Sequence, residues 1–481
     1  MVFSDVAFVY AFLPVALLFI VPVLRTRVAP AAILLFSLLF FYWTSGLYTI
    51  LLVVSIALNY LAGLLLGRRK ARWVLFGAVA LNVLLLAHYK YAGFILGSLG
   101  LPEGNPWLAY SDTIILPIGI SFYTFQGISY IVDVWREDTE VERDPIRFGA
   151  YLSFFPQLIA GPIVRFADVR RDFLAPKVSV DNMLAGASRF SVGLFKKVVI
   201  ADTCAVIADN AFAAAPGELG MAAAWAGALA YAIQIYFDFS GYSDMALGIA
   251  LIFGIRIPEN FNHPYAASTI TNFWRRWHIS LSSWFRDYLY IPLGGNRAGS
   301  GRTYLNLLIV FAVTGLWHGA AWTFVIWGLW HGAFIIAERV TLGKRAAVIE
   351  SDALRYLYAF PVAVFGWVLF RAETLPQALR YMGDMLALHR PGALDVANQV
   401  FATLNSTQSI ILVVGVVAML VQGRYVPLGR WAAALAYKDE TDAPIGAAQL
   451  GLRVCISLVF FAWATVYIFS QDFSPFLYFR F

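Results

Sequence analysis

Two copies of the tripeptide Trp-His-Gly lie close together in an otherwise apolar stretch, VTGLWHGAAWTFVIWGLWHGAF, at residues 313–334. Imidazole exchanges protons near neutral pH, so a histidine in apolar surroundings is a candidate for general acid–base chemistry. On one continuous helix, His318 and His331 would be separated by a rise of about 20 Å and a rotation of about 220°. One compact site would then use only one of them, unless the helix breaks at the Gly-Ala-Ala step 319–321. The alternative for either histidine is a buried ring bonded to a backbone carbonyl.

A third histidine, His278, lies in a basic and aromatic stretch, TNFWRRWHISLSSWFRDYLYIPLGGNR, at 271–297. An aromatic stripe at helical spacing predicts a helix lying along the membrane interface, and its basic residues place the segment 255–303 on the cytoplasmic side. The stripe consists of Trp277, Leu281, Trp284 and Tyr288, and the basic residues are mainly Arg275, Arg276 and Arg286. The triplet 275–277 can bind the phosphates of a cytosolic donor such as a coenzyme A thioester, or it can bind anionic lipid, which we favour.

Two carboxylates flank a predicted helix break in the sequence DFSGYSD, 238–244. Asp238 or Asp244 can orient a histidine or relay a proton there. Either one can also cap the start of a helix at the break, and we favour such a structural role.

The composition predicts an all-α, polytopic membrane protein. Of the 481 residues, 60% are hydrophobic and only 13% are charged, and the apolar runs reach membrane-spanning length. The net charge of +6 comes from Lys and Arg in short loops, which is the pattern of membrane topology and does not indicate a nucleic-acid partner. Cys204 and Cys455 lie in apolar sequence and indicate neither a disulfide nor a metal site.

The loops between the first five apolar runs predict an orientation. Basic residues follow the first, third and fifth runs, and the loops between the other runs carry no Lys or Arg. Because basic loops face the cytoplasm, we expect the N-terminus outside. The runs cover 6–24, 29–46, 47–66, 73–99 and 113–135.

The stretch YLSFFPQLIAGPIVRF, 151–166, departs from a simple span because it is short, is interrupted by Pro and Gly, and has basic residues on both sides. We expect it to be re-entrant, with its irregular backbone surrounded by protein or by a water-filled cavity. In all, we expect about eleven or twelve crossings plus re-entrant pieces, within a single membrane domain over 1–481.

Seven stretches occur in order along most of the chain, and together they are specific: LPIGISFYTFQGISYIVDVWR (116–136), FFPQLIAGPIVR (154–165), GLFKKVVIAD (193–202), YFDFSGYSDMALG (236–248), NFWRRWHISLSSWFRDYLYIPLGGNR (272–297), GLWHGAAWTFVIWG (315–328) and SPFLYFRF (474–481). Through them the sequence resembles the membrane-bound O-acyltransferase (MBOAT) family, in its bacterial alginate O-acetyltransferase branch.

The resemblance implies a ring-like helical bundle around a central tunnel, with an essential histidine at the constriction. That histidine lies in the first Trp-His-Gly and corresponds to His318. A second polar position, Asn in many eukaryotic relatives and His in this branch, corresponds to His278. No family role corresponds to His331, which we therefore expect to be structural.

The resemblance also implies a reaction, the transfer of an acetyl group from a cytosolic thioester, acetyl-CoA, across a bacterial inner membrane. We expect neutral His318 to act as general base, and His278 to orient the thioester or to donate a hydrogen bond to its carbonyl. An acyl-histidine intermediate is also open. No cofactor is expected to stay bound. An extracytoplasmic partner of the SGNH-hydrolase-like type is expected to complete the transfer to a polysaccharide such as alginate.

Other functions are compatible with the same motifs. The acceptor can be cellulose, peptidoglycan or another glycan, or teichoic acid that receives D-alanine from a carrier protein. A transporter or channel, in which the histidines relay protons without acyl chemistry, is the alternative from another class.

Overall fold

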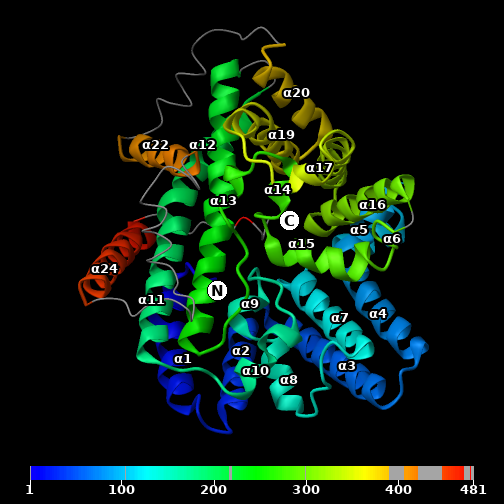
Figure 1. The fold of residues 1–481 in the computed structure, drawn as a ribbon, viewed down its shortest axis with the longest axis vertical. Coiled ribbons are helices and arrows are strands. Elements are labelled where there is room, and N and C mark those ends of the chain that lie inside the picture. Colours follow the sequence, from blue (N-terminus) through cyan, green and yellow to red (C-terminus); the bar gives the residue numbers. More distant parts are fainter. Residues whose placement is uncertain are drawn as a thin grey trace. The chain divides into compact units, whose positions relative to one another are not determined.

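The computed structural model describes residues 2–102, 104–215, 219–297, 299–388, 406–420, 447–470 and Leu477. These residues are largely helical and contain no strand, which confirms the all-α prediction (Figure 1). The chain forms two compact units, one made of Met1–Phe190 and Tyr242–Glu259, the other of Ser191–Gly241 and Asn260–Phe481. Two helices, α11 (Val180–Phe195) and α13 (Met221–Ile252), contribute residues to both units. The single membrane domain over 1–481 stays a prediction.

Apolar helices near the N-terminus build much of the first unit. They are α1 (Leu13–Ile20), α2 (Ala29–Ser45), α3 (Thr49–Arg68), α4 (Arg72–Leu86) and α5 (Ala92–Ser98). Gly46, with a φ of +57°, separates α2 from α3, because this backbone conformation is accessible mainly to glycine. The predicted run at 113–135 becomes α7 (Ile120–Arg136), which packs against α3 and α4. A short helix, α6 (Pro106–Asp112), precedes it.

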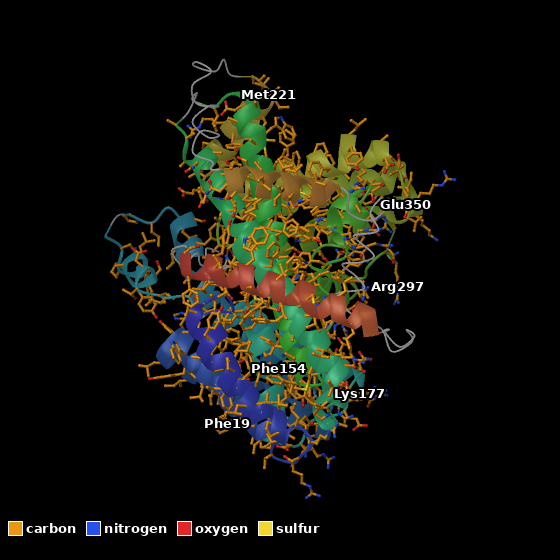
Figure 2. All side chains as sticks on the ribbon, turned by 90° about the vertical axis from the view of Figure 1, so that its left-hand side faces the viewer. Phe19, Phe154, Lys177, Met221, Arg297 and Glu350 are labelled. Atoms are coloured by element: carbon orange, nitrogen blue, oxygen red, sulfur yellow. The ribbon has the colours of Figure 1, made fainter. Side chains whose placement is uncertain are left out.

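The stretch 151–166 has the broken backbone that its Pro and Gly residues predict. Helices α8 (Pro145–Leu152), α9 (Phe155–Leu158) and α10 (Phe166–Leu174) are joined here by irregular turns. Phe154, labelled in Figure 2, is fully buried in one of these turns. Gln157 donates to the carbonyl of Tyr151, and the Tyr151 hydroxyl donates to the carbonyl of Val164, so side chains satisfy part of the freed backbone. The prediction that protein encloses the irregular backbone of 151–166 is thus confirmed. That the stretch enters the membrane and returns to the same side stays a prediction.

The predicted break at 238–244 is wrong, because α13 continues through it. Neither aspartate caps a helix there. In the first unit, Asp244 accepts from the guanidinium of Arg189, which is buried and also donates to Glu259. In the second unit, Asp238 pairs with the buried ammonium of Lys197 at 2.9 Å. The capping role that we favoured for these aspartates is therefore wrong, and both take part in ion pairs that the sequence did not predict.

The second unit surrounds an aromatic core with short and long helices. After a π-helical turn, Lys196–Ala201, its helices are α12 (Asp202–Ala213), α14 (Ile270–Trp274), α15 (Ile279–Phe285), α16 (Ser300–His318), α17 (Trp322–Thr341), α18 (Asp352–Leu354), α19 (Phe360–Arg371), α20 (Leu375–Met385), α22 (Ser406–Leu420) and α24 (Ala447–Ser470). Helix α17 packs against α14, α16 and α19. The core of the second unit includes four fully buried tryptophans, Trp277, Trp317, Trp327 and Trp367.

A helix over most of the aromatic stripe is confirmed, because α15 and the π-helical turn Arg286–Tyr290 that follows it carry all of the stripe except Trp277. Trp277 lies instead in a bend, Arg275–His278, between α14 and α15. Trp277 and Trp284 are buried in the protein, and the position of the helix at the membrane interface stays a prediction. Buried Glu338, on α17, fixes the start of α14 by accepting from the backbone N–H groups of Ile270 and Thr271. The cytoplasmic placement of 255–303 stays a prediction.

Several described helices are long and apolar enough to cross a membrane. They span Ala29–Arg68, which includes the turn at Gly46, and Arg72–Ser98, Asp352–Arg371 and Leu450–Ser470. Two shorter apolar stretches are Phe8–Val23 and Ser406–Met419. Multi-pass topology agrees with the composition. The total of eleven or twelve crossings stays a prediction.

We expect Lys197→Met to lower the free energy of unfolding by about 3–5 kcal/mol, because it leaves Asp238 buried without its counter-charge. The measurement is thermal unfolding of the detergent-purified protein. The control is Lys196→Met at the neighbouring, partly exposed lysine. Equal unfolding temperatures for the two variants and the wild type would contradict the expectation.

Candidate active site

The helix that carries the two Trp-His-Gly copies is broken between them. Helix α16 ends at His318, and Gly319 and Ala321 are extended, with φ of −157° and −150°. Helix α17 then begins at Trp322. The rise and rotation calculated for one continuous helix therefore do not apply, and the allowance for a break at 319–321 is confirmed.

Glycines let α16 and α17 pack closely side by side in an antiparallel hairpin. A Cβ atom at Gly315 would collide with the backbone of Phe324, and one at Gly328 would collide with the backbone of Phe311. These pairs run in opposite directions along the two helices. The close approach brings both histidines toward the same aromatic core.

His318 lies buried in an aromatic shell. Its ring centre is 4.9 Å from that of Trp317, 5.0 Å from Trp327 and 5.4 Å from Phe370. The ring of His278 also lies near it, with 6.3 Å between the two imidazole centres. The structure thus brings together the two histidines predicted to be catalytic.

His278 is fully buried at the bend between α14 and α15, and its backbone is left-handed, with φ of +44°. Its Nδ1 lies 3.1 Å from Oδ1 of Asn260. The same Oδ1 accepts from the backbone N–H of Ser280 at 3.2 Å. Because a backbone N–H can only donate, this atom of Asn260 must be the oxygen, and Nδ1 of His278 must carry a proton.

This hydrogen bond corrects the donor role expected for His278. Burial lowers the pKa of His278 to about 3, so the ring is neutral at physiological pH. A neutral ring protonated at Nδ1 has only a lone pair at Nε2. His278 therefore cannot donate a hydrogen bond to a thioester carbonyl through Nε2, although it can accept one.

Trp327 contacts the rings of both His318 and His331, at 5.0 Å and 5.3 Å between ring centres. His331 is fully buried, stacks on Phe273 and meets Trp274 edge-on. Within the described part of the chain, neither of its ring nitrogens has a hydrogen-bond partner, so it differs from the carbonyl-bonded histidine that we gave as the alternative. Its surroundings are those of a packing residue.

A small cavity lies beside His318 in the second unit. It offers about 10 Å³ to the centre of a water molecule, roughly the room that one water needs. The aromatic rings of Trp277, Trp327 and Phe370 contribute to its wall. A thioester and a hydroxyl need more space, so substrates must displace some of these side chains.

Six wall residues of this cavity were not proposed as site residues, and Asp238 was weighed only as a carboxylate that could orient a histidine or relay a proton. The six are Ile235, Phe239, Trp327, Trp367, Phe370 and Leu477. Asp238 reaches it while pairing with Lys197, and its second oxygen accepts from the backbone N–H of Leu477 at 3.0 Å. Leu477 itself is buried against the cavity. For Leu477 only the motif match at 474–481 gave a signal, because no local pattern reveals a contact with a residue as far away in sequence as Asp238.

The structure separates the predicted donor triplet 275–277. Trp277 lines the cavity, whereas Arg275 is exposed. Arg276 donates to the side chain of Asn272 at 2.9 Å. One phosphate group near Arg275 would therefore not also meet Trp277 in the cavity.

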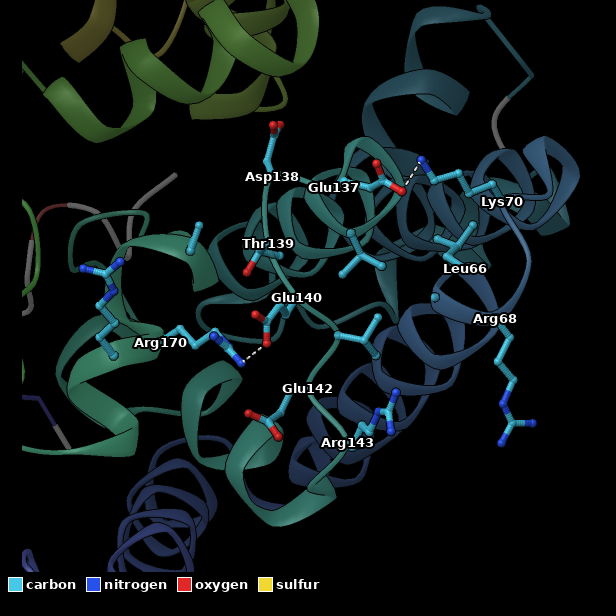
Figure 3. Close-up of a pocket in the computed structure, with 15 residues that line it drawn as sticks. Leu66, Arg68, Lys70, Glu137, Asp138, Thr139, Glu140, Glu142, Arg143 and Arg170 are labelled. Carbon is cyan, nitrogen blue, oxygen red and sulfur yellow. Dashed lines mark hydrogen bonds and ion pairs between the residues drawn. The ribbon is translucent and has the colours of Figure 1, made fainter.

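The first unit has a separate, open hollow of about 860 Å³, lined by loops predicted to face the cytoplasm (Figure 3). Its charges are partly neutralised by ion pairs, Lys70 with Glu137 and Arg170 with Glu140. It contains no histidine or cysteine. Among the described residues, no group of three His, Cys, Asp or Glu side chains can hold a metal ion, and both cysteines are free thiols.

Comparison with known proteins identifies the class to which this fold and histidine pair belong. Residues 37–372 match MBOAT, the membrane-bound O-acyltransferase family. Since this match covers more than half of the chain, the protein belongs to the membrane-bound O-acyltransferase family, as its motifs predicted. It is an enzyme, an acyltransferase of the membrane, and the transporter or channel alternative is set aside.

Individual relatives extend this similarity over the whole chain. The chain is 40% identical to the probable alginate O-acetylase AlgI of Azotobacter vinelandii, with all of both chains covered. It is 43% identical to the protein of the same name in Pseudomonas aeruginosa, over 80% of this chain and 75% of that one. It is 38% identical to a peptidoglycan O-acetyltransferase of Helicobacter pylori, over 81% and 80%.

We expect His331→Phe to retain acyl transfer and to change the free energy of unfolding by less than about 1.5 kcal/mol, because the ring packs among aromatic side chains and loses no hydrogen bond. Thermal unfolding and an acyl-transfer assay check this. His318→Phe, in the same aromatic core, is the matched variant that should lose activity. Loss of transfer in well-folded His331→Phe would show that His331 does more than pack.

Proposed function

We propose that this protein transfers an acetyl group from a cytosolic thioester, acetyl-CoA, for O-acetylation of an exopolysaccharide such as alginate. The observation that carries the proposal is the buried His278–His318 pair beside a cavity, in a chain similar over its full length to an alginate O-acetylase. The membrane is the bacterial inner membrane, and the N-terminus is extracytoplasmic, as the basic loops favour.

His318 acts as the general base of this reaction. Its imidazole takes the proton of the attacking hydroxyl, the oxygen forms an ester bond with the acetyl carbon, and the carbon–sulfur bond breaks. His318 then returns the proton to the departing thiolate, so the donor leaves as a thiol. The dry aromatic walls of the cavity limit competing hydrolysis, because they leave room for about one water.

Donor and acceptor reach the histidine pair from opposite sides of the membrane through a tunnel in the bundle. Trp277 lines the cavity and contacts the thioester end of the donor, while Arg275 and Arg276, which lie outside the cavity, bind donor phosphates or anionic lipid. An extracytoplasmic SGNH-hydrolase-like partner takes the acetyl group onward to the polymer, as the resemblance to the alginate O-acetyltransferase branch implies.

We expect His318→Ala to reduce acetyl transfer by about 10²–10⁴-fold, which is the usual effect of losing a general base. The assay uses purified protein with radiolabelled acetyl-CoA, the partner and polymer. His263→Ala is the control, because His263 lies in a turn before Pro264 and outside the cavity. Near wild-type transfer by folded His318→Ala would overturn the assignment.

A second acceptor, peptidoglycan, is favoured by the similarity to a peptidoglycan O-acetyltransferase. The two acceptors are separated by incubating membranes with labelled donor and both polymers and then measuring the ester-linked label on each. Label on peptidoglycan alone would replace alginate in the proposal. Absence of label from both would direct the search to cellulose, other glycans and teichoic acid.

A further inference from the structure

Asn260 is the centre of a hydrogen-bond cluster that the catalytic pair alone does not explain. Its Oδ1 accepts from Nδ1 of His278, from the backbone N–H of Ser280 and from the Ser280 hydroxyl at 2.9 Å. Asn260 itself is almost fully buried. Three donors converging on one oxygen fix both the orientation of the amide and the direction of the bond to His278.

The backbone around His278 is held by the same segment. The N–H of Asn262 donates to the carbonyl of Arg276, and the N–H of Ile279 donates to the carbonyl of Asn260, each at 2.9 Å. His278 itself supplies no side-chain cap to α15, and Oδ1 of Asn260 takes the N–H of Ser280 in its place. A non-glycine residue with positive φ costs of order 1 kcal/mol, so the surrounding bonds must favour this conformation.

The result is a buried lone pair at Nε2 of His278. Nε2 has no hydrogen-bond partner among the described residues. The ring contacts Phe239, Trp317 and His318, at centre-to-centre distances of 4.7, 5.9 and 6.3 Å. Phe239 has no polar group, and of the other two only His318 is suited to take a proton from a substrate.

We propose that Asn260 is a positioning residue that fixes His278 as a hydrogen-bond acceptor toward His318. The inference rests on the proposed function and refines it. In the reacting state one nitrogen of His318 donates to Nε2 of His278, and the other nitrogen of His318 takes the proton of the hydroxyl. Asn260 and His278 thereby orient the base and stabilise its protonated form, as the third group of a catalytic triad does.

The two rings must approach for this contact. An N–H···N bond of about 2.9 Å places two imidazole centres roughly 5 Å apart, whereas here they are 6.3 Å apart. Catalytic hydrogen bonds are often long before substrate binds and shorten in the complex, and an approach of about 1 Å is of this kind. Because substrate entry must move the aromatic walls of the cavity, the two rings can approach each other at that stage.

Among the described residues, the ring contacts of His278 come from α16 and α13. Helix α16 contributes the titratable His318 and also Trp317, and α13 contributes Phe239. Asp238, the residue before Phe239, is paired with Lys197 and Leu477. On its own segment, Arg275 is exposed. The protonation of His278 is therefore governed by burial and by the partner of Nδ1.

The test compares Asn260→Ala, Asn260→Asp and the matched control Asn262→Asp, whose position is exposed. We expect Asn260→Ala to lower kcat about tenfold or more with little change in KM, because the residue orients a base and does not bind substrate. Asn260→Asp keeps an acceptor for Nδ1 and should recover most of kcat above neutral pH. As the pH is lowered, the activity of Asn260→Asp should begin to fall at a higher pH than that of the wild type. The reason is that the carboxylate favours the protonated form of His278, which cannot accept a hydrogen bond. The control should match wild type.

A readout independent of activity is the nitrogen NMR spectrum of protein labelled at histidine, with His278→Gln to assign the signals. We expect His278 to be protonated at Nδ1 and bare at Nε2 in wild type and in Asn260→Asp, and to lose this preference in Asn260→Ala. A wild-type proton at Nε2, or full kcat in Asn260→Ala, would overturn the inference. Failure of wild type to acetylate any polysaccharide, with the Nδ1 proton present, would instead overturn the proposed function.

Discussion

Burial of polar groups in a dry interior is the constraint on which this structure depends. Two buried charges on neighbouring helical segments are tied to partners, Arg189 to Asp244 and Lys197 to Asp238. Leaving one member of such a pair alone costs several kcal/mol, so the pairs determine which helices can lie together. The same rule gives the catalytic pair its character, because desolvation keeps His278 neutral and Asn260 decides which nitrogen carries the proton.

The aromatic core converts two identical tripeptides into residues with different roles. Trp327 contacts both His318 and His331, yet only His318 lines the cavity and neighbours a second histidine. His331 is enclosed by aromatic rings, and neither of its nitrogens has a hydrogen-bond partner among the residues that the structure describes. Sequence identity between the two copies therefore carries no information on function, which is set by the faces that the α16–α17 hairpin presents.

Much of the fold could be predicted from local patterns, whereas the site could be predicted only in part. Apolar runs gave the long helices, and the Pro and Gly residues of 151–166 gave its broken backbone. The regular aromatic stripe from Trp277 to Tyr288 predicted one helix. The segment bends at its start, and hydrogen bonds to Asn260 and Glu338, both distant in sequence, hold the two sides of the bend. Likewise, DFSGYSD has the residues of a break, yet burial and ion pairs keep α13 continuous. The family motifs identified His318 and His278, whereas Asn260, the hydrogen-bond partner of His278, could be identified only from the structure.

The left-handed backbone at position 278 has a consequence for which residues can occupy it. Besides glycine, the residues that tolerate positive φ best are Asn, Asp and His. These are also residues with short polar side chains that can take part in hydrogen bonding. The resemblance to the family places Asn or His at this position. The same left-handed bend is therefore compatible with the residue found in both groups of relatives. Amino-acid substitutions at this position during the divergence of related enzymes would then be restricted by the backbone conformation, independently of the chemistry of the side chain.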